Sequence, residues 1–129
     1  GLVAVLAPEL SRQAIFDALK TRRCYAASGA RILIDFRLDG AVMGEEITLP
    51  EEAGRRLWVR VVGEGSLGQV ELLKNSQSYV CQHLDGSADL VIFTLTDWQA
   101  ERNTDYYYVR VTQADGRHAW SSPIWVNSS

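Results

Sequence analysis

Two different periodicities divide the chain into a short N-terminal part and a longer C-terminal part. Between Ser11 and Arg23, apolar side chains recur at three- and four-residue spacing behind a good N-cap, Ser11, which predicts one α-helix. From Ala30 onward, apolar and polar positions alternate every second residue, which is typical of β-strands. The pattern therefore predicts a helix and turn over residues 1–29, followed by a β domain over residues 30–129.

Seven or eight short strands are expected in the β domain. Their apolar runs fall near residues 32–38, 57–61, 70–73, 79–82, 90–95, 105–113 and 118–126. Asp-Gly pairs lie between several of these runs and predict tight turns, because both residues tolerate positive φ. No second helix is indicated, so an antiparallel β-sandwich is favoured over a parallel α/β sheet.

The alternation also predicts which side chains form the core. The set expected to be buried together between two sheets is Ile34, Phe36, Val59, Val61, Ile92, Val109 and Val111. The continuous apolar run Leu90 to Leu95 predicts a strand covered on both faces or capped by aromatic neighbours. Tyr107, with Val109 and Val111, resembles the Tyr-x-Val-x-Val strand of fibronectin type III and immunoglobulin-like domains, where such a tyrosine often forms the tyrosine corner.

Composition and charge narrow the classes of partner. The chain has 129 residues, a formal net charge of −3 and 13 Lys and Arg residues spread along it, so neither nucleic acid nor a membrane surface is an expected partner. The apolar start is stopped by Pro8 and Glu9, too early to span a bilayer, and we expect the chain to be a piece of a longer polypeptide. Cys24 and Cys81 are expected to be free thiols. The sequence does not assign the protein to a cellular compartment.

The sequence offers no convincing catalytic motif, metal site or cofactor site. Residues 63–68 fit the dinucleotide pattern G-x-G-x-x-G, but a strand is expected after them instead of a helix, so a glycine-rich hairpin is predicted. Adjacent glutamates at 45–46 and 51–52 would point to opposite faces of a strand and are expected to be solvated turn charges. His83 and His118 each lack a second close ligand, and the nearby Cys81 and His83 are most simply a packed cysteine and a half-exposed histidine.

Aromatic residues are the remaining candidates for binding. Tyr106 and Tyr108 fall on the strand face opposite to Tyr107, and Trp120 and Trp125 lie on the partner strand. Such a group serves sugar or protein binding when it is solvent-exposed, and packing when it is buried, so both alternatives stay open.

Two stretches of the sequence carry a resemblance to a known family. The run ELSRQAIFDALKTRRCYAASGARILIDFRLDGAVMG and the later run DYYYVRVTQADGRHAWSSPIWV resemble the C-terminal part of bacterial PHP-superfamily proteins, the polymerase-and-histidinol-phosphatase type of metal-dependent phosphoesterase. The resemblance implies a catalytic barrel upstream that holds the divalent metal, a helix that closes it, and an appended sandwich. It also places Arg22, Arg23 and Tyr25 at the barrel edge, where they would contact another domain or a substrate phosphate, or simply match the dipole of a helix C-terminus.

The predicted helix has a wide apolar surface. Its apolar residues cover an arc of about 200°, more than one sheet can bury, so Phe16 is expected to contact the missing barrel, or to drive self-association without it. Two functions follow as hypotheses. The first is a non-catalytic accessory sandwich that packs on or shapes the catalytic domain of a PHP-like phosphoesterase, and the second is an independent carbohydrate- or protein-binding module.

Overall fold

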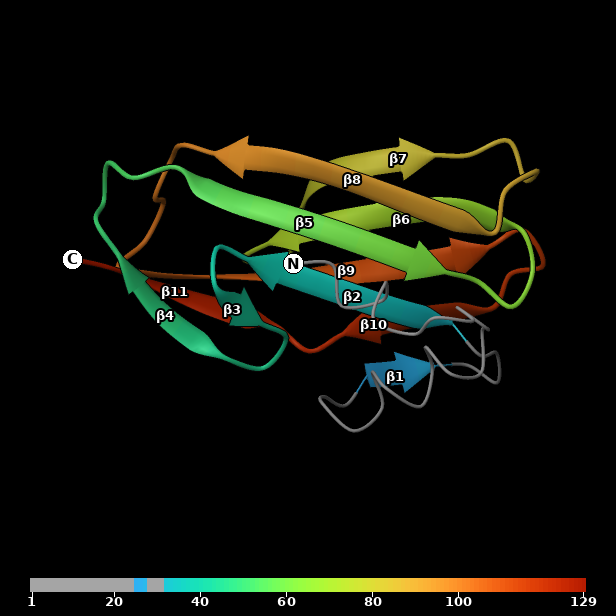
Figure 1. The fold of residues 1–129 in the computed structure, drawn as a ribbon, viewed down its shortest axis with the longest axis horizontal. Coiled ribbons are helices and arrows are strands. Elements are labelled where there is room, and N and C mark those ends of the chain that lie inside the picture. Colours follow the sequence, from blue (N-terminus) through green and yellow to red (C-terminus); the bar gives the residue numbers. More distant parts are fainter. Residues whose placement is uncertain (1–24, 28–31) are drawn as a thin grey trace.

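The computed structural model describes residues 25–27 and 32–129, which form β-strands joined by turns and loops (Figure 1). In chain order the strands are β1 (Tyr25–Ala27), β2 (Leu33–Leu38), β3 (Ala41–Val42), β4 (Glu46–Leu49), β5 (Arg55–Val62), β6 (Leu67–Lys74), β7 (Gln77–His83), β8 (Leu90–Asp97), β9 (Thr104–Gln113), β10 (His118–Ser121) and β11 (Ile124–Ser128). The helix predicted between Ser11 and Arg23 lies outside the described residues.

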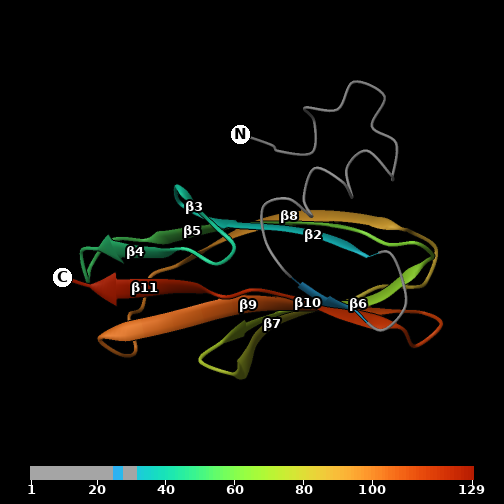
Figure 2. The same cartoon turned by 90° about the horizontal axis from the view of Figure 1, so that it is seen from below.

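The strands form two sheets that lie face to face, as Figure 2 shows. The smaller sheet has four antiparallel strands in the order β3-β2-β5-β8. In the seven-stranded sheet the long strand β9 pairs with β6 along one side, and β6 pairs with β7. Along its other side β9 pairs first with β11 and then with β10, which carry β4 and β1 respectively. Chain segments far apart in sequence thereby become neighbours at both ends of β9.

The core between the sheets is built from the alternating positions that the sequence predicts. On the four-stranded sheet, Ile34 pairs with Val61 and Phe36 with Val59, and all four side chains are fully buried. On the facing sheet, Val109 and Val111 of β9 are buried as well. Apolar side chains at every second position drive the sheets together because burial removes their surface from water.

Several expectations need correction. The described part of the chain has eleven strands instead of seven or eight. β1 and β3 are too short to show an alternation, the four alternating residues of β4 were not counted as a strand, and residues 118–126 fall into two strands, β10 and β11. The pairing of β4 with β11 is parallel, so the larger sheet is mixed. Ile92 is 49% exposed and not part of the core. It lies on β8, which is an edge strand with alternating exposed and half-buried residues and is not covered on both faces.

The glycine-rich loop at residues 63–66 is not a hairpin. It connects β5 in one sheet with β6 in the other, and the Oε1 atom of Gln113 accepts hydrogen bonds from the backbone amides of Glu64 at 2.8 Å and Gly65 at 3.0 Å. A Cβ atom on Gly63 would stand 2.5 Å from the carbonyl oxygen of Gly65, so the crossing requires glycine there. As expected, a strand follows the motif, and the pyrophosphate-binding helix is lacking.

Candidate functional site

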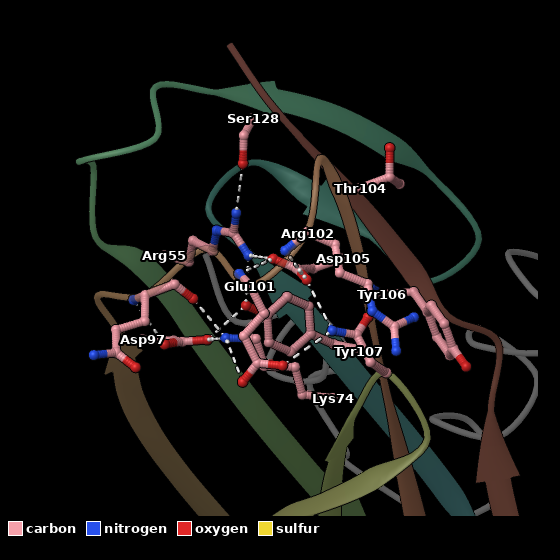
Figure 3. Close-up of polar contacts among 12 residues, drawn as sticks. Arg55, Lys74, Asp97, Glu101, Arg102, Thr104, Asp105, Tyr106, Tyr107 and Ser128 are labelled. Carbon is pink, nitrogen blue, oxygen red and sulfur yellow. Dashed lines mark hydrogen bonds and ion pairs between the residues drawn. The ribbon is translucent and has the colours of Figure 1, made fainter.

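A cluster of charged side chains is buried between the two sheets at one end of the sandwich (Figure 3). Its five central members come from four strands and are each at most 3% exposed: Arg55, Lys74, Asp97, Asp105 and Tyr107. We call this set the ionic cluster. Ionised groups are costly to remove from water, so their burial requires that each one be paired.

The Tyr107 hydroxyl lies at the centre of the ionic cluster. It accepts a hydrogen bond from Nη1 of Arg55 at 2.8 Å and donates one to Oδ2 of Asp97 at 2.6 Å. The same Asp97 oxygen accepts a bond from Nζ of Lys74 at 2.6 Å, while Arg55 Nη1 also binds Oδ2 of Asp105 at 2.7 Å. Tyr107 therefore bonds to side chains that reach it from the opposite sheet, where a tyrosine corner would bond to nearby backbone.

Asp105 holds the connection between β8 and β9 in place. Its carboxylate accepts hydrogen bonds from the backbone amides of Glu101 and Arg102, both at 3.1 Å, and from the side-chain amide of Asn75 at 2.8 Å. These bonds satisfy backbone donors that the loop leaves without a strand partner. The loop that precedes β9 is thus fixed by the same carboxylate that neutralises Arg55.

The contacts shift the acid-base behaviour of the cluster. Burial alone would raise the pKa of Asp97, but the hydrogen bonds from Lys74 and Tyr107 outweigh it and the pKa is lowered. The pKa of Asp105 is likewise lowered, because bonds from Asn75 and Arg55 outweigh its burial. Burial, together with the neighbouring Asp97 carboxylate, raises the pKa of the Tyr107 phenol. At neutral pH the carboxylates are therefore charged and the phenol is protonated.

The ionic cluster is suited to holding the sheets together and not to catalysis. Its central side chains are shielded from solvent, and each is engaged by another member. A catalytic group needs access to its substrate, which this arrangement denies. We interpret the ionic cluster as a structural feature that fixes the two sheets relative to each other.

Aromatic side chains gather instead on the outer face of the seven-stranded sheet. Tyr106 and Tyr108 on β9 have near-parallel rings whose centroids are 6.4 Å apart. Trp125 pairs with Tyr106 across the strands, and Trp120 pairs with Arg110. Trp120 is 40% and Trp125 37% exposed, whereas the two tyrosines are half-buried. The sequence assigned Trp120 and Trp125 to one strand, whereas they lie on β10 and β11. We call these four aromatic residues the outer aromatic face.

Polar groups flank the outer aromatic face. Arg110 donates hydrogen bonds from Nε and Nη2 to Oε1 of Glu71, and the Nε bond measures 3.1 Å. The His118 ring stacks on Trp120 with centroids 5.4 Å apart. Flat rings beside hydrogen-bonding groups form a surface that can stack on a sugar or on a partner protein.

The outer face of the four-stranded sheet carries an open depression of about 630 Å³. It is lined by Trp58, Thr94 and Thr96 and by two arginines, Arg37 and Arg56. Each arginine has an acidic partner, because Arg37 lies 3.2 Å from Asp35 and Arg56 lies 3.6 Å from Asp39. The acidic neighbours partly offset the positive charge of the two arginines.

The other predicted site residues have different outcomes. Phe16, Arg22 and Arg23 lie outside the described residues, as does Cys24. Tyr25 belongs to β1, where its backbone pairs with Ser121. The expectation that Cys81 is packed was wrong, because it is exposed like His83, and its Sγ atom lies 3.6 Å from Nε2 of that histidine.

Residues 25–27 and 32–129 hold no group of three or more His, Cys, Asp or Glu side chains arranged to bind a metal ion. Within the same ranges there is no helix long and apolar enough to cross a membrane.

Sequence reasoning missed the ionic cluster, although a signal was present. Arg55 begins an apolar strand, while Lys74 and Asp97 each end one. A charged residue at the end of an apolar run indicates a side chain that lies at the edge of the core and needs an oppositely charged or hydrogen-bonding partner there. The partners themselves follow only from the order of the strands.

The relatives found by comparison with known proteins are themselves described as uncharacterized. Residues 1–55 match a family described as a protein of unknown function, DUF3604. An uncharacterized protein of Chlamydia trachomatis is 36% identical over 140 residues, which cover 98% of this chain and 22% of that protein. One from Chlamydia pneumoniae is 34% identical, covering 98% of this chain and 23% of that protein. The chain thus spans about a fifth of the length of these curated relatives.

Solved structures give weaker likenesses. The fibronectin(III)-like modules of Clostridium thermocellum CbhA superpose with a TM-score of 0.44 at 11% identity, covering 73% of this chain and 95% of that one. A Niemann-Pick type C2 protein from the Japanese carpenter ant gives a TM-score of 0.44 at 7% identity, covering 81% and 99%. Likenesses at this level do not bear on function. The chain is therefore similar, over nearly its whole length, to one segment of much longer chlamydial proteins of unknown activity.

Proposed function

We propose that this chain is a non-catalytic accessory β-sandwich of a longer, PHP-like metal-dependent phosphoesterase, and that it packs on or shapes the catalytic domain. The observation that carries the proposal is the contrast between the buried charged side chains and the exposed aromatic ones. The buried charges bond to one another in the ionic cluster, while the outer aromatic face stays open to a partner. A rigid scaffold with an exposed aromatic surface suits contact with a neighbouring domain.

The lengths of the relatives support an accessory role. In the Chlamydia trachomatis protein the matching segment makes up 22% of the polypeptide, so the relative has ample chain for other domains. The phosphoesterase class rests on the sequence resemblance, which implies that any divalent metal belongs to the upstream domain. The upstream catalytic domain is the proposed partner.

A second function is favoured by the exposure of the two tryptophans. Trp120 and Trp125 are each more than one third exposed and share a face with Tyr106 and Tyr108. An independent carbohydrate- or protein-binding module would display its rings in this way. Binding of soluble oligosaccharides, measured by the quenching of tryptophan emission, distinguishes this module from an accessory domain.

Catalytic activity provides the direct test. We expect the isolated chain to leave an aryl phosphate unhydrolysed with manganese or zinc, and the longer polypeptide that contains it to hydrolyse the same ester. Metal-dependent turnover by the isolated chain that disappears in His83→Ala or His118→Ala would show that the chain has its own active site. A longer polypeptide that is inactive on phosphate esters would contradict the phosphoesterase assignment.

A further inference from the structure

Cys81 and His83 form an exposed pair of metal-ligating side chains on strand β7. The two residues are separated by one position, so they lie on the same face of the strand, beside Glu71 and Gln69 of β6. The thiol is free, and its Sγ atom lies 3.6 Å from Nε2 of the imidazole. A thiolate and an imidazole bound to one tetrahedral zinc ion are about 3.5 Å apart, given Zn–S and Zn–N bonds of about 2.3 and 2.0 Å.

One such pair supplies only half of a zinc site. Structural zinc takes four protein ligands, and no third His, Cys, Asp or Glu is placed to complete the set in the described part of this chain. The described residues of one chain therefore do not complete the site, and a second molecule can supply the two missing ligands. The nature of β7 indicates where that molecule would attach.

β7 is an edge strand that pairs only with β6 among the described strands. Six of its seven residues are exposed, and it contains no Lys, Arg, Asp, Glu, Pro or Gly. Natural edges are usually guarded by charges, prolines or bulges. The register shift opposite Leu72 and Leu73 disrupts the first half of β7 but leaves the half with Cys81 and His83 regular.

We propose that two copies of this chain bind one zinc ion between their β7 strands, with Cys81 and His83 of each copy as the four ligands. Antiparallel pairing centred on Gln82 places Cys81 opposite the second copy's His83, and His83 opposite the second copy's Cys81. Directly opposed residues in such a pair have Cβ atoms about 4.5–5.5 Å apart, so all four side chains meet on one face.

The pairing would extend over Val80 to Leu84. Leu84 is still held against β6, because its amide donates to the carbonyl of Gly68 at 2.9 Å. On binding, each thiol releases its proton to solvent and the imidazole binds as the neutral ring. The resulting set of two thiolates and two imidazoles is a common structural zinc centre.

Zinc-dependent mass in solution tests the proposal. With a reducing agent present to prevent disulfides, we expect zinc chloride to double the mass measured by light scattering, with one zinc ion per two chains, and EDTA to reverse the change. Cys81→Ser and His83→Ala should each remain monomeric. His118→Ala, which removes the other histidine, and Cys24→Ser should dimerise like the wild type.

Cobalt(II) reports the ligand geometry independently. The wild type should give the intense visible bands of tetrahedral cobalt and a thiolate-to-cobalt absorption band, which Cys81→Ser should lose. Thermal unfolding without metal should be unchanged in both ligand variants because the two side chains are exposed. A mass that does not change at saturating zinc, a dimer that persists in Cys81→Ser, or an octahedral cobalt spectrum would overturn the proposal.

Discussion

The Tyr107 hydroxyl donates a hydrogen bond to Oδ2 of Asp97 at 2.6 Å, and this bond joins the two sheets of the sandwich. Tyr107 belongs to β9 in the seven-stranded sheet, whereas Asp97 ends β8 in the four-stranded sheet. Both residues are buried, so the bond forms where water cannot replace it. The sheets are therefore tied by a polar contact as well as by apolar packing.

Removing the Tyr107 hydroxyl should weaken the fold while keeping its ring in the core. We expect Tyr107→Phe to lower the free energy of unfolding by about 1–3 kcal/mol, because Asp97 and Arg55 each lose a buried partner. Urea unfolding measures this loss. Tyr106→Phe is the matched control, because its hydroxyl forms a hydrogen bond with the exposed Ser76. Equal stability of the two variants would contradict the role of the ionic cluster.

Breaking a buried ion pair should cost more than breaking a neutral hydrogen bond. Lys74→Met leaves the carboxylate of Asp97 buried without its cation, and we expect a loss of about 3–5 kcal/mol. Arg117→Met removes one member of an exposed ion pair with Glu64, and should change stability by less than about 1 kcal/mol. Denaturant unfolding of both variants provides the comparison. A loss of unfolding free energy for Lys74→Met as small as that for Arg117→Met would show that the ionic cluster does not stabilise the fold.

The same cluster should make the fold sensitive to acid. Asp97 and Asp105 have lowered pKa values in the folded chain, so their charged forms contribute stability above the ordinary carboxyl pKa of 3.8. That contribution is lost as the pH falls from near 3.8 through the lower folded-state pKa values. We expect the melting temperature to fall over this window, and Asp97→Asn to start lower and fall less steeply. The exposed Glu51→Gln should keep the wild-type profile, and a flat wild-type profile would refute the linkage.

Phe36 and Ile92 test the distinction between core and edge. Both were expected in the core, but Phe36 is fully buried and Ile92 is 49% exposed. Phe36→Ala should cost about 3–5 kcal/mol, a large part of the stability of a domain of this size. Ile92→Ala should cost less than about 1 kcal/mol. Similar losses for the two variants would show that β8 is more buried than its position at the edge implies.

The contrast between Phe36 and Ile92 shows what sequence periodicity can predict and what it cannot. Alternation placed Phe36 correctly because one face of β2 must pack against the facing sheet. The continuous apolar run of β8 has no such period, so it could not reveal that the strand lies at an edge.

Contacts between residues far apart in the chain could not be predicted from the sequence, for a different reason. Arg55 and Asp105 are 50 positions apart and meet only because β5 and β9 lie in facing sheets. Alternation along β9 places Tyr106 and Tyr108 on one face of the sheet. Trp120 and Trp125 are five positions apart, so they would point to opposite faces of one continuous strand. They share a face because the chain forms two strands there, β10 and β11, which pair separately with β9. Local alternation thus predicted part of the outer aromatic face, and long-range order determined the ionic cluster.

The measurement that tests the central claim most directly is binding of this chain to the rest of the longer polypeptide, produced separately, by titration calorimetry. If the outer aromatic face contacts the upstream domain, the wild type should bind at one-to-one stoichiometry, and Trp120→Ala combined with Trp125→Ala should weaken binding at least about tenfold, or 1.4 kcal/mol. Trp98→Ala removes a tryptophan that is 68% exposed but lies outside this face, and it should bind like the wild type. Absence of binding by the wild type, or equal binding by the double variant, would contradict the account.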